Sequence, residues 1–189
     1  MGSNINIGLV YSDSSNIEDR IKKILDLMKE RNSQIEFVKY CEDADGDNWT
    51  ELDNPLVNDT ILGEISMSFY GQIQLCFDLF QYARLSAEIK IDKHEDYWGI
   101  LLSLDEEKLL PNYSMQTLEK ATNSIIDFIE EIYPILKFDY AICDHEAEIE
   151  LSPHEFKPEN YSLSFLPDLS KASLSIRKSN WHINGLTER

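Results

Sequence analysis

Residues 71–104, GQIQLCFDLFQYARLSAEIKIDKHEDYWGILLSL, decide the fold of this chain. Apolar side chains alternate with polar ones in three runs of this stretch, 73–79, 85–91 and 98–104. Because the side chains of a strand point alternately to opposite faces, each run predicts a strand with one apolar and one polar face. Short turns such as KHED, residues 93–96, separate the runs. Three such strands in succession predict an antiparallel meander.

The segments around the meander extend the sheet and supply helices. Residues 61–69 alternate in the same way and predict a further strand, with Gly71 at the turn that follows. The opening residues 5–40 are typical of strand, helix and strand, and their middle part, 17–31, has apolar side chains at helical spacing.

Beyond the meander the pattern changes to one helix and then more strands. The helix is expected at 114–138, and the strands at 139–151, 161–166 and 171–178. The chain therefore predicts a single α+β domain, residues 1–189, in which a largely antiparallel sheet (meander plus C-terminal strands) packs against two main helices.

The charge of the chain limits its partners. Thirty-five Asp and Glu residues stand against 17 Lys and Arg residues, which gives a formal net charge of −18. Such a field repels nucleic-acid phosphates and anionic lipid, and it attracts basic proteins or cations. We therefore expect a basic protein partner, and neither nucleic acid nor a membrane.

Composition also indicates where the protein works. The N-terminal MGSNINIGLVYSDSS has no basic segment followed by a long apolar run, so it is unlike a signal peptide. The three cysteines are widely spaced and form no CxxC motif, which favours reduced thiols. A cytoplasmic protein without a cofactor is the expectation.

The stretch CEDADGDNWTELDNP, residues 41–55, concentrates carboxylates and has no lysine or arginine. Asp43, Asp45 and Asp47 alternate like the first ligands of a calcium loop, but the twelfth position of such a loop is Asn54 here, which cannot be the bidentate carboxylate. We expect an electrostatic surface and no metal site, with a calcium-responsive module as an alternative.

An aromatic residue lies within this acidic run. Trp49 suits protein docking, because tryptophan anchors an interface while the charges around it steer the partner. An equally weighted alternative is that Trp49 folds back onto the core. The partner-binding residues predicted here are Asp43, Asp45, Asp47, Trp49 and Glu51.

A second acidic segment is AICDHEAEIEL, residues 141–151. If this segment is one strand, four carboxylates share a face and repel one another. That row is either a second partner surface or an ordinary face compensated by bases such as Lys171 and Arg177. Its predicted binding residues are Asp144, Glu146, Glu148 and Glu150.

The opposite face of the same predicted strand carries Cys143 and His145. A cysteine nucleophile needs a positive, partly exposed setting, whereas these neighbours are apolar or acidic. A buried thiol and a core imidazole are therefore favoured. An enzyme or small-molecule-binding domain, with its site in a sheet cleft near Cys143/His145, remains the alternative function.

The layout of the whole chain resembles a known class of proteins. NINIGLVYSDSSNIEDRIKKIL (4–25), a meander ending in YWGILLSL (97–104), a long helix and an acidic strand are similar to small acidic immunity proteins of bacterial polymorphic toxin systems. The resemblance implies a cytosolic α+β protein without enzymatic activity, which binds and neutralises a cognate, often basic, toxin domain. It carries over no functional residues, because no motif matches them.

Overall fold

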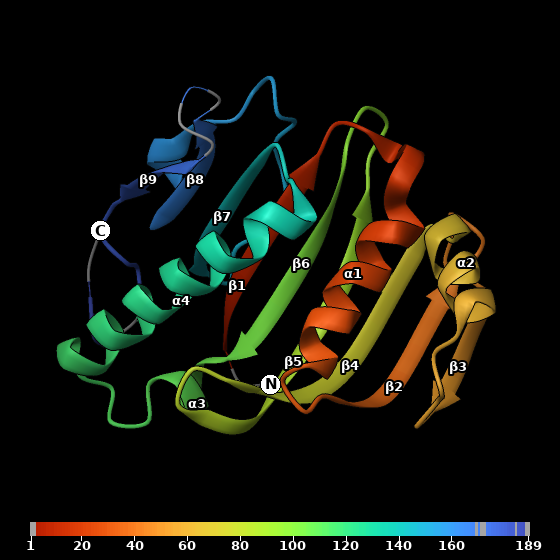
Figure 1. Cartoon of the computed structure of the whole chain (residues 1–189), viewed down its shortest axis with the longest axis horizontal. Helices are drawn as coiled ribbons and strands as arrows, with labels where there is room; N and C mark the ends of the chain where they lie inside the picture. The colour runs from red at the N-terminus through yellow and green to blue at the C-terminus, as the bar shows by residue number, and fades with distance from the viewer. Residues whose placement is uncertain (1–2, 169, 171–172, 184, 188–189) are drawn as a thin grey trace.

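The computed structural model describes residues 3–168, 170, 173–183 and 185–187 (Figure 1). Its strands and helices are β1 (Asn4–Tyr11), α1 (Ile17–Lys29), β2 (Gln34–Cys41), β3 (Trp49–Asp53), α2 (Asp59–Met67), β4 (Tyr70–Leu79), β5 (Tyr82–Lys93), β6 (Trp98–Asp105), α3 (Glu106–Leu109), α4 (Met115–Leu136), β7 (Tyr140–His145), β8 (Leu163–Asp168) and β9 (Ser173–Lys178). Short 3-10 turns lie at Ser14–Asn16 and Pro158–Asn160.

Within the described residues, nine strands form one sheet in the order β3-β2-β4-β5-β6-β1-β7-β8-β9. Every neighbouring pair is antiparallel. Strands β4, β5 and β6 follow in chain order, which confirms the meander. Strand β1 pairs with β6, the last strand of the meander, and on its other side with β7. Ile7 of β1 therefore lies opposite both Leu102 of β6 and Cys143 of β7. The predicted α+β class with a largely antiparallel sheet is confirmed.

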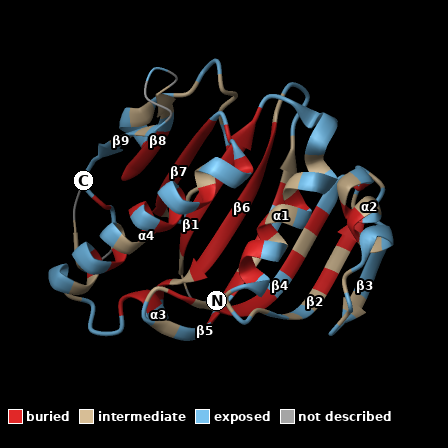
Figure 2. Cartoon of the chain, viewed as in Figure 1, coloured by how far each residue is buried: buried red, intermediate tan, exposed pale blue. Residues whose placement is uncertain are grey.

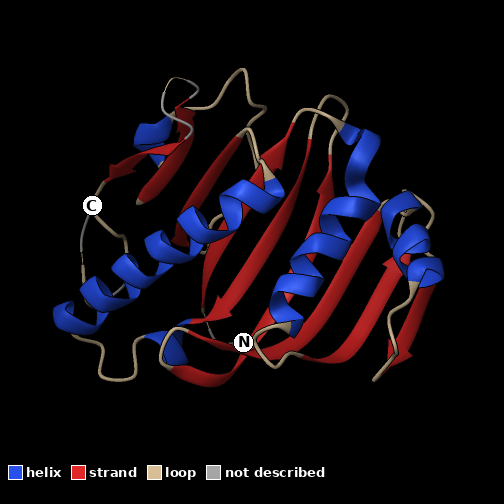
Figure 3. Ribbon diagram, in the orientation of Figure 1, coloured by secondary structure: helices blue, strands red, loops and turns tan. Residues whose placement is uncertain are grey.

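Helices α1, α2 and α4 lie on one side of this sheet (Figure 3). The apolar stripes of α1 and α4, including Ile21, Ile24, Ile125 and Ile129, are buried in one core with the inward side chains of the strands. Figure 2 shows the matching bands of buried and exposed residues along β2 and β4. Burial of each such side chain stabilises the fold by about 1.5–3 kcal/mol. Among the described helices, none is long and apolar enough to cross a membrane.

The run predicted as a strand before the meander is instead helix α2. Asn58 begins this helix, because its side-chain Oδ1 accepts a hydrogen bond from the Ile61 N–H at 3.1 Å. Ile65 then packs on β4 at Gly71, where a Cβ atom would lie 2.8 Å from the Ile65 Cγ2. Gly71 is thus a contact point inside β4 and not a turn. The spacing of Ile61 and Ile65, four residues apart, fits a helix as well as a strand.

The face of the sheet opposite the helices is called the open face here. The covering segment, residues 146–161, crosses part of it. Ile149 of this segment packs with Leu101 and Ile142 in a second apolar cluster. The contact with β6 requires glycine, because a Cβ atom on Gly99 would lie 2.4 Å from the Ile149 Cδ1. Strands β6, β1 and β7 form the covered half of the open face.

Strands β3, β2, β4 and β5, which follow one another from one edge of the sheet to β6, form its bare half. Many of their outward side chains are polar, and Gln74, Ser86 and Lys90 are exposed to solvent. Gln72 and Glu88 of the neighbouring strands β4 and β5 lie opposite Lys90 and Gln74, respectively. One side of a single sheet is therefore partly core and partly surface.

Candidate partner-binding face

The acidic loop, residues 42–48, joins β2 to β3 and is organised by one of its own carboxylates. The Asp43 Oδ1 accepts a hydrogen bond from the Asp47 N–H at 2.8 Å, and the Oδ2 accepts one from the Asn48 N–H at 2.9 Å. The Cys41 thiol donates to the same Oδ2 at 3.2 Å. These bonds, above all that from the Asp47 amide, hold the pKa of Asp43 well below its usual range.

The geometry of this loop differs from that of a calcium loop. Both oxygens of Asp43 face N–H donors, while Asp45 and Asp47 are exposed. Nowhere in the described ranges do three His, Cys, Asp or Glu side chains converge as metal ligands. Asp43 therefore shapes the loop, and the carboxylates of Asp45 and Asp47 remain exposed to solvent.

Trp49, the first residue of β3, does not enter the core. Its side chain is 42% exposed and stacks on Tyr70 of β4, with 5.9 Å between the ring centroids. The indole Nε1–H donates to the Gly46 carbonyl at 2.9 Å. The Lys39 ammonium lies 4.9 Å from the centre of the indole ring. Trp49 is thus held in place and still exposed, as an anchor at an interface has to be.

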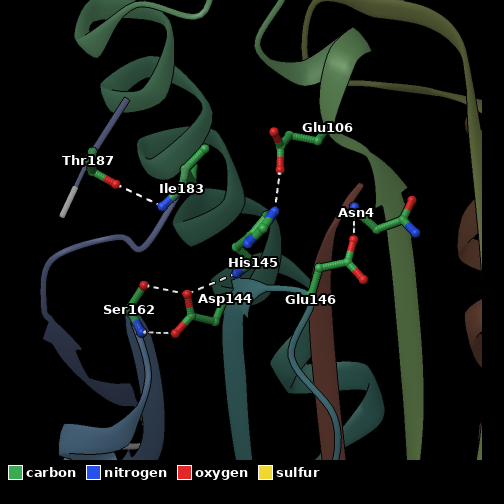
Figure 4. A network of polar contacts seen from close by, with 8 residues as sticks. All are labelled: Asn4, Glu106, Asp144, His145, Glu146, Ser162, Ile183 and Thr187. Atoms are coloured by element: carbon green, nitrogen blue, oxygen red, sulfur yellow. Dashed lines mark hydrogen bonds and ion pairs between the residues drawn. The ribbon is translucent and has the colours of Figure 1, made fainter. Parts of the chain in front are cut away.

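The second acidic segment does not form the predicted row of carboxylates. Strand β7 ends at His145, and Glu146 has a left-handed φ of 52° that turns the chain away from the sheet. Asp144 is buried, and its carboxylate accepts hydrogen bonds from the N–H and the hydroxyl of Ser162, at 2.9 and 2.6 Å (Figure 4). The Glu146 Oε1 accepts the Asn4 N–H at 2.6 Å. Asp144 is therefore structural.

The other two carboxylates of this segment, Glu148 and Glu150, lie on the covering segment and are exposed. Arg177, predicted to compensate the row, approaches Glu159 instead, at 3.6 Å. The other predicted base, Lys171, lies outside the described residues. The prediction of one strand with four carboxylates on one face was wrong. Residues 146–151 alternate between apolar and polar because Ile149 packs on the open face while its neighbours face solvent, and this arrangement needs no strand.

Two depressions of the open face share Tyr70, Lys90 and Asp92 in their walls, and together they are called the open-face groove. The first, about 150 Å³, lies between Trp49, Tyr70 and Lys90, and the second, about 370 Å³, runs from Tyr70 past Asp92 to Glu148. The open-face groove is defined by the residues that line them: Trp49, Phe69, Tyr70, Lys90, Asp92 and Glu148. Trp49 from the first acidic stretch and Glu148 from the second therefore line the same groove.

The charges of this groove are unequally satisfied. Lys90 forms an ion pair with Glu88 at 2.9 Å, and the Lys93 ammonium donates to the carbonyls of Ser66 and Ser68. Asp92 receives no hydrogen bond and no ion pair from the residues that the structure describes.

Comparison with known protein families gives a match over residues 1–189 to a family model described as immunity protein 64. The chain belongs to the immunity protein 64 family. No curated protein and no solved structure shows a significant match. Membership confirms the resemblance to immunity proteins of toxin systems, and the biological role of such a protein is to neutralise a toxin.

For a member of the immunity protein 64 family, the alternative site near Cys143 and His145 has little support. Cys143 is fully buried, and burial first, then the charge of Asp144, raise the pKa of its thiol well above the usual range. The His145 Nε2 lies 2.9 Å from the Oε2 of the buried Glu106 (Figure 4). Thiol and imidazole thus serve the packing of β7 and are not arranged as a nucleophile and its base.

Sequence reasoning missed Phe69, Tyr70 and Asp92 as residues of this face. Phe69 and Tyr70 are 53% and 46% exposed, although both are large and apolar. Two consecutive aromatic residues, Phe69 directly before β4 and Tyr70 at its first position, were a signal in the sequence. Asp92 had none, since a single acid on the polar side of a strand is ordinary.

Proposed function

We propose that the protein neutralises its cognate toxin by docking the bare half of the open face onto a basic surface of the toxin. The mechanism is masking by contact, with no reaction catalysed and no cofactor used. It takes place in the cytoplasm, where the free thiols of Cys41, Cys76 and Cys143 remain reduced. Neither nucleic acid nor a membrane takes part, because the net charge of −18 repels both phosphates and anionic lipid.

One observation supports this proposal most strongly. The bare half presents two stacked, exposed aromatic rings, Trp49 and Tyr70, in the same groove as an unpaired carboxylate, Asp92. Tryptophan and tyrosine are the residues that most often dominate interface energies, and charges around them raise the association rate. Two rings stacked on each other beside a carboxylate in one groove have the composition of an interface centre.

The carboxylates around the groove have different parts in this proposal. Asp43 keeps the acidic loop in shape, and Asp144 and Glu146 hold the covering segment to the sheet. The residues proposed to act on the toxin are Asp45, Asp47, Trp49, Glu51, Glu148 and Glu150, together with Tyr70.

The test compares two exposed aromatic residues. Trp49→Ala should weaken binding to the cognate toxin about 30-fold or more, which is the effect of removing an interface residue that contributes 2 kcal/mol or more. Tyr113→Ala is the matched control, because Tyr113 is 43% exposed but lies between α3 and α4. Surface plasmon resonance and survival of toxin-expressing cells measure the effect. Equal affinities of both variants and the unchanged protein would refute docking at this face.

A further inference from the structure

The open-face groove has the composition of a receptor for one particular side chain. Its inner end is bounded by Tyr70 of β4, by Asp92 of β5 and by Glu148 and Ile149 of the covering segment. Aromatic and aliphatic side chains line this depression together with Lys90, Lys93 and His94 and with two carboxylates that come from different parts of the chain. The volume of about 370 Å³ is sufficient for a long side chain to enter.

Asp92 is the least satisfied charge in this groove. It is half-buried, and burial raises the pKa of its carboxyl, partly opposed by His94 and Lys90 and reinforced by Glu148. Lys90 is already paired with Glu88, and the His94 ring stacks on Tyr97 at 4.2 Å between centroids. A carboxylate that is partly shielded from water, and has no ion-pair partner among the described residues, is stabilised by an incoming cation.

The rings of this protein are already used as cation sites. The Lys39 ammonium lies over the Trp49 ring, and the Arg20 guanidinium lies 4.5 Å from the centre of the Tyr11 ring. A planar guanidinium matches a groove with an aromatic wall and two carboxylates better than an ammonium does. It stacks on a ring and binds carboxylates through paired N–H donors at the same time.

We infer that the open-face groove receives one arginine side chain of the toxin, with its stem between Tyr70 and Ile149 and its guanidinium against Asp92 and Glu148. The inference rests on the proposed function and adds to it the chemical identity of the central contact. Trp49 and the acidic loop then lie around this contact, where they exclude water and steer the toxin.

The test uses N-acetyl-arginine amide as the probe and needs no toxin. Titration of the isotope-labelled protein should shift the Trp49 indole N–H and the Ile149 methyl resonances in a saturable way. N-acetyl-citrulline amide, which has nearly the same shape without the charge, should leave them in place. Asp92→Asn should weaken the arginine affinity about tenfold, the scale of one charge-assisted hydrogen bond. Glu130→Gln, at an exposed position on α4, is the matched control and should bind normally.

The outcomes separate this inference from the proposed function. Equal shifts with citrulline, or arginine shifts that persist unchanged in Asp92→Asn, overturn the inference. The proposed docking would still stand if Trp49→Ala abolished protection from the toxin. The opposite outcome is also informative. If the arginine-specific shifts were lost in Asp92→Asn, but Trp49→Ala and Asp92→Asn both still protected cells fully from the toxin, docking of the toxin on the bare half would be overturned. Far-UV circular dichroism of each variant establishes that it is folded.

Discussion

The covered and bare halves of the open face belong to one sheet, but the covered half packs against another segment of the chain and the bare half faces solvent. On the covered half, Gly8 and Gly99 leave room for Ile149, and the apolar side chains beneath become a second core. On the bare half, the strands carry polar side chains where the covered half has glycine and apolar ones, and Trp49 and Tyr70 remain exposed. The difference teaches that the outward side chains of this sheet are buried where a segment crosses it and stay exposed where none does.

The largest expected effect is on the covered half. Ile149→Ala should reduce the free energy of unfolding by about 2–4 kcal/mol, because it empties the space between two glycine-lined strands. Leu56→Ala is the control, since Leu56 is 92% exposed and should change stability by less than about 0.5 kcal/mol. Urea denaturation measures both. If Ile149→Ala reduced the free energy of unfolding as little as Leu56→Ala does, the covering segment would contribute nothing to the stability of the fold.

A smaller effect should distinguish the two acidic segments. Asp144→Asn should reduce the free energy of unfolding by about 1–3 kcal/mol. The Asp144 carboxylate accepts two hydrogen bonds from Ser162 and one from the His145 N–H, and an amide cannot accept all three. Asp47→Asn should leave stability within about 0.5 kcal/mol, since that side chain is exposed. Thermal denaturation of both variants checks this order. If Asp47→Asn were the more damaging, the acidic loop would be structural and Asp144 would not.

The smallest effect concerns Asp92 on the bare half and depends on pH. Because burial raises the pKa of Asp92 in the folded state, the native protein holds this proton more tightly than the unfolded chain. Its contribution to stability is present below the unfolded pKa and is lost as pH rises through the folded pKa. Asp92→Asn should therefore raise the melting temperature slightly at pH 7, and the difference should shrink on acidification toward pH 4, near the ordinary carboxylate range.

That comparison has its own control. Glu130→Gln on α4 should show no such pH-dependent gain, because Glu130 is exposed. A melting temperature of Asp92→Asn below that of the unchanged protein at pH 7 would show that Asp92 already has a stabilising partner. The bare half would then lack the uncompensated charge that distinguishes it from the covered half.

The errors of the sequence-based prediction share one cause. The stretch 61–69 and the stretch 146–151 both alternate in polarity, and both were predicted as strands. The first is mostly helix α2, because Asn58 caps a helix whose Ile65 packs on Gly71. The second leaves the sheet at Glu146, because Ile149 finds its contacts on β1 and β6. Alternation over five or six residues is satisfied by any arrangement that buries every second side chain.

The sequence by itself determined the α+β class, the meander, the two main helices, the excess of negative charge and the likeness to immunity proteins. The class, the meander, the helices and the charge follow from composition and from the local periods of strands and helices, which require no knowledge of distant contacts. The likeness to immunity proteins came from a resemblance of the whole layout to a known class. Only the tertiary structure decided which half of the open face is covered and which carboxylates are structural. It alone placed Trp49, Tyr70, Asp92 and Glu148 in one groove. The reason is physical: strand order, register and the packing of Ile149 on glycine depend on contacts between residues far apart in the chain, and no local period records them.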